Sequence, residues 1–216
     1  VILGMSKKVL EQPENWFHEG MHAILRNGER LLSLINQMLD LSRLESGSME
    51  LTLQQADIIF HLDYLVQSFR PFAIANGIDL HFLKRSNQQM MDFDPEKLAK
   101  VLQNLLSNAI KHTPEGGNIY VQVWTETDDL MLVVKDTGEG IPKADLPFIF
   151  DRFYRVRQSS EGEKHTSSGT GIGLALTKEM VSLMNGSIEA KSKLKEGTEV
   201  LIKLPITQNA EVRPIS

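Results

Sequence analysis

The sequence predicts an α+β fold in which a helical segment precedes a domain of mixed helices and strands. Residues 1–48 repeat apolar side chains at helical spacing, whereas residues 49–206 alternate helical patterns with short strand patterns. The chain has 216 residues, of which 41% are hydrophobic, enough for one well-packed core and an appendage. Residues 207–216 have no regular pattern and are expected to be a tail or linker.

Composition excludes several classes of function. The net charge of −5 gives no electrostatic reason to expect a nucleic-acid partner. The chain has no cysteine, so disulfides, thiolate metal sites and a cysteine nucleophile are excluded. No apolar run approaches the roughly 18 residues of a membrane span, and no signal-peptide pattern is present. We therefore expect a soluble segment.

Two helices are expected in residues 1–48. The first ends before Pro13, and the second runs from about Trp16 to Glu45. Apolar residues in the second helix follow the alternating four- and three-residue steps of a bundle seam: Phe17, Met21, Ile24, Leu31, Ile35 and Met38, interrupted by Gly28 and Ser42. A single hairpin buries only part of such a stripe, so we expect a homodimer through a four-helix bundle. The alternative is a hairpin packed on its own domain.

Residues 49–206 are expected to contain six strands and three helices. Alternation of apolar and polar residues predicts the strands at 50–54, 78–83, 117–127, 130–136, 187–193 and 198–204, with a hairpin turn at Asp128–Asp129. Helical spacing predicts helices at 57–72, 95–112 and 171–184. Asp94 is the expected N-cap of the second of these helices, and Asn185–Gly186 the stop of the third.

The stretch SSGTGIGLAL, Ser167–Leu176, places three glycines within five residues ahead of an apolar helix. Glycine allows positive φ and close backbone approach, and a helix start presents unpaired N–H groups that attract anions. The stretch therefore predicts a phosphate site. A plain connecting turn is the alternative unless other segments supply a reader for the base, a metal ligand and a lid.

Polar side chains at helical spacing in residues 95–112 provide candidate ligands. Asn104, Asn108, Lys111 and His112 fall within an arc of roughly 100°. Amide oxygens suit Mg²⁺, and a Lys or His suits phosphate. A solvated helix face is the alternative, but it explains the two asparagines poorly because asparagine is a mediocre helix former.

A strand end and a polar loop supply the other candidates. Asp136 ends a buried strand and is followed by Gly138 and Gly140, so its carboxylate could accept a hydrogen bond from an exocyclic amine. An Asp–Gly turn that merely closes a strand is the alternative. The segment FIFDRFYRVR precedes residues 157–168, whose polar composition predicts a lid over a phosphate tail.

Taken in order, NLLSNAIKHTP, DTGEGI, FIFDRFYR, GTGIGLAL and the pair Gly197–Thr198 resemble conserved boxes of sensor histidine kinases. These are the N box, first glycine box, F box, second glycine box and final glycine of the gyrase-like and chaperone-like ATPase superfamily. The stretch RLLSLINQMLDLSRLESGSMEL resembles the second dimerisation helix. The resemblance thus covers nearly the whole chain.

The resemblance implies a two-layer α/β sandwich of the Bergerat type, a mixed sheet backed by three helices, which binds ATP and Mg²⁺. It implies that Asp136 reads the adenine amine, that Asn108 binds Mg²⁺ and that Arg155 contacts the γ-phosphate. Lys111 and His112 would approach the phosphates. The implied ATP-binding residues are Asn108, Lys111, His112, Asp136, Gly138, Gly140, Ile141, Arg155, Gly169, Thr170, Gly171, Gly173 and Leu174.

The resemblance also implies a reaction. The ATPase branches carry a water-activating Glu where this chain has Asn104, so transfer of the γ-phosphate to a histidine is favoured over hydrolysis, with Asn104 and Arg155 as catalytic residues. The family's acceptor histidine stands before Arg-Thr-Pro, and no such segment occurs here. We expect it to precede Val1, so this segment alone should not phosphorylate itself. A gyrase-like or chaperone-like ATPase module is the alternative.

Partners and location follow from the same resemblance. The phosphate would pass to an aspartate of a response-regulator receiver, separate or in the same polypeptide as in hybrid kinases. The segment would be the cytoplasmic portion of a bacterial signal-transduction protein that is membrane-anchored at full length. One rival remains, because His18-Glu19-Gly20-Met21-His22 matches the H-E-x-x-H pattern of zinc peptidases. The bundle stripe explains the same residues, and no third ligand is evident.

Overall fold

The chain forms two compact units in a computed structural model, which describes residues 1–156 and 170–207. The first unit is Val1–Met49 and the second is Glu50–Ser216. None of the helices in the described ranges combines the length and apolar character that a membrane span requires.

The first unit is a helical hairpin of α1 (Ile2–Glu11) and α2 (Pro13–Glu45). Pro13 occupies the first turn of α2, where its missing N–H costs nothing, so this helix begins slightly earlier than expected. A Cβ at Gly20 would lie 2.2 Å from Cγ2 of Val9, so glycine at this position permits the close approach of α1. The predicted seam is left open, because five of its side chains are 47–54% exposed: Phe17, Met21, Leu31, Ile35 and Met38.

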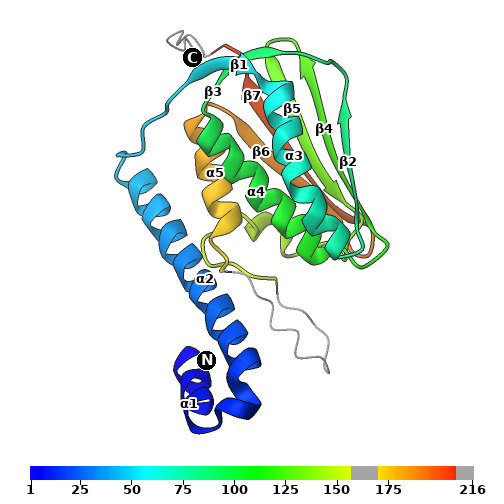
Figure 1. Cartoon of the computed structure of the whole chain (residues 1–216). Coiled ribbons are helices and arrows are strands. Elements are labelled where there is room, and N and C mark those ends of the chain that lie inside the picture. Colours follow the sequence, from blue (N-terminus) through cyan, green and yellow to red (C-terminus); the bar gives the residue numbers. More distant parts are fainter. Residues whose placement is uncertain (157–169, 208–216) are drawn as a thin grey trace. The chain divides into compact units, whose positions relative to one another are not determined.

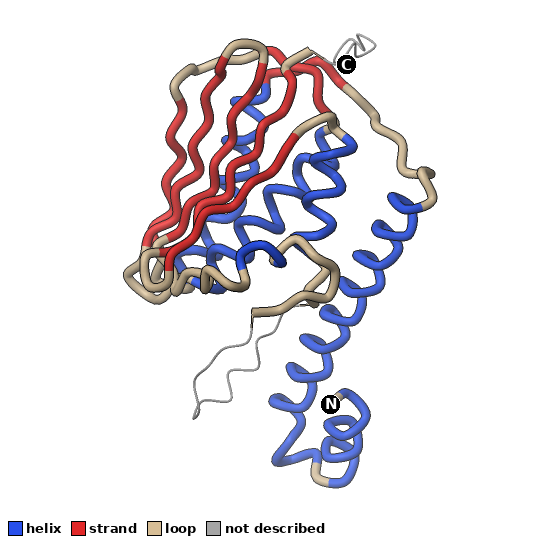
Figure 2. The backbone as a smooth tube through the Cα atoms, turned by 180° about the vertical axis from the view of Figure 1, so that it is seen from behind, coloured by secondary structure: helices blue, strands red, loops and turns tan. Residues whose placement is uncertain are grey.

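The second unit has two layers, a five-stranded sheet and three helices that all cover one of its faces (Figures 1 and 2). The strand order is β2-β4-β5-β7-β6, and only the β2–β4 pair is parallel. The strands are β2 (Asp79–Lys84), β4 (Asn118–Glu126), β5 (Asp129–Asp136), β6 (Ser187–Lys193) and β7 (Gly197–Pro205). The helices are α3 (Ile58–Ala75), α4 (Pro95–His112) and α5 (Gly173–Leu183), with a short 3₁₀ helix, η1, at Leu146–Phe148. The predicted fold class is confirmed.

The core lies between the sheet and the helices. Along β4, Ile119, Val121 and Val123 are at most 1% exposed, while the intervening residues face the other side of the sheet. The apolar stripe of α4 meets them and is likewise buried: Leu98, Val101, Leu102, Leu105, Leu106, Ala109 and Ile110. This packing fixes the rotation of α4 and leaves its polar stripe at the edge of the core.

Two features differ from the sequence prediction. The strand expected at 50–54 lies later, as β1 (Gln54–Asp57), and it pairs with β3 (Met90–Phe93), which was not anticipated. The alternation in these short strands is obscured because β1 is polar and β3 carries the buried Asp92. The hairpin turn between β4 and β5 is Thr127–Asp128, one residue earlier than predicted, with Thr127 at φ 55°.

Candidate functional site

Helix α4 carries the first group of candidate residues, and its start is firmly fixed. The carboxylate of the N-cap Asp94 accepts hydrogen bonds from the backbone N–H groups of Glu96 and Lys97, both at 3.1 Å. Burial tends to raise the pKa of Asp94, but hydrogen bonds from the Lys97 side chain and from the Thr52 and Lys97 backbones outweigh it, so the pKa is lowered. Asp94 is therefore held ionised at the positive end of the helix dipole.

Asn104 lies at the contact between α4 and α5. Its Nδ2 donates to Oγ1 of the buried Thr177 at 2.6 Å. A Cβ at Gly173 would lie 2.4 Å from Oδ1 of Asn104, so glycine is needed where α5 begins. The two helices thus hold the Asn104 amide in one orientation. Asn108, one turn further along α4, is half-buried.

Asp136, at the end of β5, is a buried carboxylate with 8% exposure. Its Oδ1 accepts hydrogen bonds from the N–H groups of Gly138 at 2.8 Å and Thr198 at 3.2 Å. Burial raises the pKa of Asp136, and these two hydrogen bonds and the nearby His112 offset only part of the increase. Because both hydrogen bonds reach the same oxygen, Oδ2 is left to accept from a ligand.

The backbone around Asp136 is packed so closely that only glycine fits. A Cβ at Gly138 would lie 2.2 Å from the carbonyl oxygen of His112. Gly197, at φ 98°, approaches the backbone of Asp136 itself, and a Cβ there would lie 1.9 Å from its carbonyl oxygen. Gly140 lies against the backbone of Lys193. These contacts place DTGEGI between the end of α4 and the β6–β7 turn, as a single surface.

His112 lies beside this surface, at the end of α4. Its Nδ1 and Oε1 of Glu139 are 2.6 Å apart, and both side chains are partly exposed. The N–H of Glu139 also donates to the carbonyl oxygen of His112 at 3.1 Å. Lys111 is exposed in the same last turn. The N–H of Ile141 donates to Oγ of Ser192 at 2.8 Å, which anchors the far end of the segment.

The second glycine box forms the start of α5. Thr170 Oγ1 accepts from the N–H of Ile172 at 3.2 Å, and the carbonyl of Gly171 accepts from the N–H of Phe153 at 2.7 Å. The N-cap residue of α5, Ile172, makes no side-chain cap, so the first-turn N–H groups, including that of Leu174, are suited to an anion. Arg155 is exposed in the segment that follows η1. Gly169 and the predicted lid, 157–168, lie outside the described residues.

Sequence reasoning missed several supporting residues. Thr177 orients Asn104, Thr198 binds Asp136, and Glu139 pairs with His112. Thr177 was detectable in principle, because it is a polar residue on an apolar helix one turn after Gly173. Thr198 and Glu139 are far in the sequence from the residues that they contact, so only the folded structure shows that they are close.

The zinc-peptidase pattern gains no further ligand. His18 and His22 are exposed on α2. Over residues 1–156 and 170–207, no three His, Cys, Asp or Glu side chains gather in a way that could hold a metal ion. Asn108, the predicted Mg²⁺ ligand, is an amide and so falls outside the residue types of that class of site.

Comparison with known proteins identifies the family of the second unit. The family model for histidine kinase-, DNA gyrase B- and HSP90-like ATPases matches residues 93–208. Hybrid signal transduction histidine kinase D from Dictyostelium discoideum is 33% identical over 98% of this chain and 14% of its own length. Sensor histidine kinase WalK from Bacillus subtilis is 33% identical over 85% of this chain and 30% of its own length.

A solved structure shares the fold. Full-length ShkA in complex with AMPPNP matches with a TM-score of 0.77 and 26% identity, over 91% of this chain and 40% of that one. The present chain spans 14–33% of the length of the curated relatives that it matches.

Proposed function

Because the chain belongs to the histidine kinase-, DNA gyrase B- and HSP90-like ATPase family and carries the catalytic domain of a sensor histidine kinase, we propose that it binds Mg-ATP between α4 and α5. In the full-length protein this domain would phosphorylate a histidine.

The buried carboxylate of Asp136 is the observation that carries the proposal. Its Oδ1 is occupied by two backbone N–H groups, so Oδ2 faces the ligand as an acceptor suited to the exocyclic amine of adenine. Gly138 and Gly140 let the DTGEGI backbone pack against the backbones of His112 and Lys193, which fixes this segment beside Asp136. The triphosphate would extend toward the backbone N–H groups in the first turn of α5, where the N-cap residue makes no side-chain hydrogen bond.

The residues present fit Mg²⁺ bound together with the phosphates. Mg²⁺ prefers oxygen ligands and usually takes few from the protein, with water and phosphate completing its shell. Asn108 offers an amide oxygen on the same helix as Asn104, whose own amide is engaged by Thr177. Asn108 is therefore the proposed protein ligand, and the metal would neutralise phosphate charge.

The proposed reaction breaks the bond between the β–γ bridging oxygen and the γ-phosphorus and forms a bond from that phosphorus to a histidine nitrogen, releasing ADP. Arg155 would stabilise the charge that develops on the γ-phosphate. Asn104 cannot deprotonate a water molecule, which favours the kinase over the gyrase-like or chaperone-like ATPase alternative. Lys111 would supply further positive charge at the end of α4, and His112, which pairs with Glu139, would approach the phosphates.

The acceptor and partners are proposed from the resemblance. None of the six histidines in the sequence precedes an Arg-Thr-Pro segment, so we place the acceptor on an upstream helix of the full-length protein. The open seam of α2 supports homodimerisation of that helical region. A response-regulator receiver would accept the phosphate, and the full-length protein would be anchored at the cytoplasmic face of a membrane.

Incubation with γ-labelled ATP tests the proposal. The full-length protein should acquire acid-labile, base-stable phosphate on an upstream histidine, and Arg155→Ala should slow the labelling without changing the product. The 216-residue chain should acquire none on His18 or His22. Rapid release of inorganic phosphate without labelled histidine would instead identify an ATPase.

A further inference from the structure

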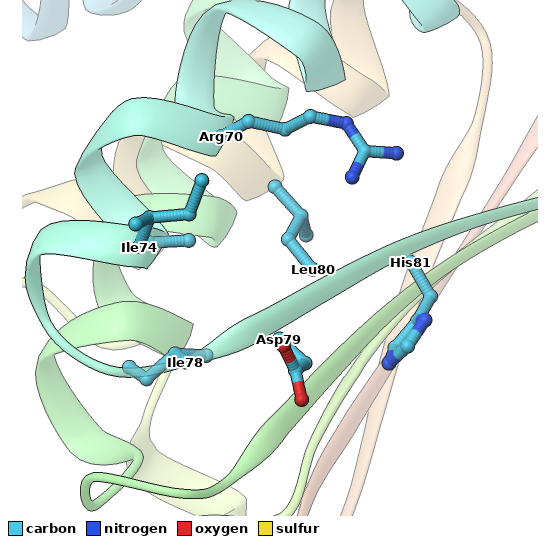
Figure 3. Close-up of a pocket in the computed structure, with 7 residues that line it drawn as sticks. Arg70, Ile74, Ile78, Asp79, Leu80 and His81 are labelled. Atoms are coloured by element: carbon cyan, nitrogen blue, oxygen red, sulfur yellow. The ribbon is translucent and has the colours of Figure 1, made fainter.

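A groove between α3 and the edge strand β2 has no part in the proposed reaction. A pocket of about 200 Å³ opens there. Figure 3 shows its apolar lining, with Ile74 from α3, Ile78 before β2 and Leu80 on the strand, and Arg70 extending from α3 beside Leu80. None of these residues belongs to the nucleotide site.

Strand β2 is an edge of the sheet, so half of its backbone groups face outward. The N–H group of Asp79 donates to the carbonyl oxygen of Gly117, just before β4, at 3.0 Å, and that of Arg85 donates to the carbonyl oxygen of Val123, within β4, at 3.2 Å. In a parallel ladder alternate residues bond to the same neighbour, so Leu80, Phe82 and Lys84 direct their N–H and C=O groups away from β4. Within the described residues no strand pairs with this side, which leaves an available template for another strand.

Of the two basic side chains beside the groove, Lys84 and Arg70, only the first has an acidic partner within the described part of the chain. Lys84 pairs with Asp63 of α3 at 3.4 Å, but Arg70 is exposed and has no carboxylate partner among the described residues. Asp79 also borders the pocket, but β2 alternates its side chains, so Asp79 and His81 lie on the face opposite the buried Leu80. His81 is further engaged by Asn118 at 3.0 Å. Arg70 is thus the cation left for a ligand.

The volume of the pocket indicates that its ligand is a single side chain rather than a small molecule. Sites for drug-sized molecules usually occupy about 300–1,000 Å³, so about 200 Å³ fits one large side chain better. Ile74 is 73% exposed at its rim, although isoleucine is among the residues that are most often buried. A side chain of a docked strand would cover it.

We propose that this groove binds an extended segment of a partner polypeptide, which adds a strand to β2. An apolar side chain of that segment fills the pocket beside Leu80, and an acidic side chain two residues away pairs with Arg70. Side chains two residues apart lie on the same face of a strand, so both can point toward α3. Main-chain hydrogen bonds would provide affinity, and the pocket and Arg70 would provide selectivity.

The test uses short blocked peptides of alternating threonine and valine with one phenylalanine and, two residues before or after it, one aspartate. Matched peptides carry lysine in place of aspartate. In amide NMR titrations, one aspartate peptide should shift the signals of Leu80, Phe82 and Lys84 and leave those of the nucleotide site unchanged. The lysine peptide should bind about two- to fivefold more weakly, the scale of an exposed ion pair.

Charge reversal provides the control. Arg70→Glu should reverse the preference, so that the lysine peptide binds better, while an unchanged melting temperature and unchanged ADP binding show that the domain is intact. Methylation of the peptide's central amide nitrogens should abolish binding. The proposal is wrong if no peptide shifts the β2 signals at millimolar concentration or if Arg70→Glu leaves the preference unchanged. Displacement of the peptide by hexanoate at equal affinity, or concentration-dependent pairing of two chains through β2, would also overturn it.

Discussion

The buried carboxylate of Asp136 lowers the stability of the folded domain, and in the proposed site it would bind the adenine amine. Burial raises its pKa, so its ionised form is unfavourable in the folded domain when no nucleotide is bound. A group whose pKa is higher in the folded than in the unfolded state contributes stability below its unfolded pKa and loses it as pH rises through the folded pKa. Asp136 therefore lowers the stability of the nucleotide-free domain as pH rises above the pKa of the unfolded carboxyl group.

Asp136→Asn separates these two effects. The N–H groups of Gly138 and Thr198 should hold the Asn carbonyl in place of Oδ1, so the NH₂ group would face the adenine amine and two donors would oppose each other. We expect ADP and ATP affinity to fall by about 1–3 kcal/mol in calorimetry. At pH 7 the melting temperature of Asp136→Asn should exceed that of the unchanged protein. This difference should vanish as the pH falls to the ordinary pKa range of carboxyl groups. Asp128→Asn, which removes the same charge at an exposed position, is the control. Unchanged ADP affinity in Asp136→Asn would refute the role of Asp136 in binding adenine.

The proposed nucleotide site requires β5, β7 and their loops to approach one another closely. Gly197 and Gly116 both have positive φ, but only Gly197 touches the Asp136 backbone. Gly116→Ala should therefore lower the free energy of unfolding by about 1–2 kcal/mol, the cost of placing an alanine in the left-handed conformation. Gly197→Ala adds the overlap with Asp136, so chemical denaturation should show a distinctly larger loss together with weaker ADP binding. Equal losses for the two variants would show that the close approach is unimportant.

Helix α2 presents an apolar seam that its own hairpin does not cover. Ile35 is 47% exposed on this seam, whereas Ser33 is exposed on the opposite side of the helix. If the seam pairs with a second copy, Ile35→Asp should convert dimers to monomers in sedimentation equilibrium, because a charge would be buried without a partner. Ser33→Asp should leave the dimer intact. A chain that is monomeric at all concentrations would contradict the dimer proposal.

The sequence predicts a helix or strand correctly where its apolar periodicity is long and regular. The helix at 95–112, its Asp94 cap and the two hairpins all form, because each depends on local spacing and capping. The β1–β3 pair could not be predicted, since its strands have four residues each and one carries the buried Asp92. The contacts of Asn104 with Thr177 and of Asp136 with Thr198 join distant parts of the chain, so only the packed fold reveals them.

In the second unit, α4, the end of β5 and the start of α5 are proposed to form one Mg-ATP site. The most direct measurement is a residue-resolved amide NMR titration of the chain with a non-hydrolysable ATP analogue, with and without Mg²⁺. We predict saturable shifts centred on residues 104–112, 136–141 and 170–174, with a response at Arg155 when the analogue carries a γ-phosphate. The side-chain amide of Asn108 should respond only when Mg²⁺ is present. Absence of saturable binding at millimolar nucleotide, or shifts centred elsewhere on the sheet, would contradict the account.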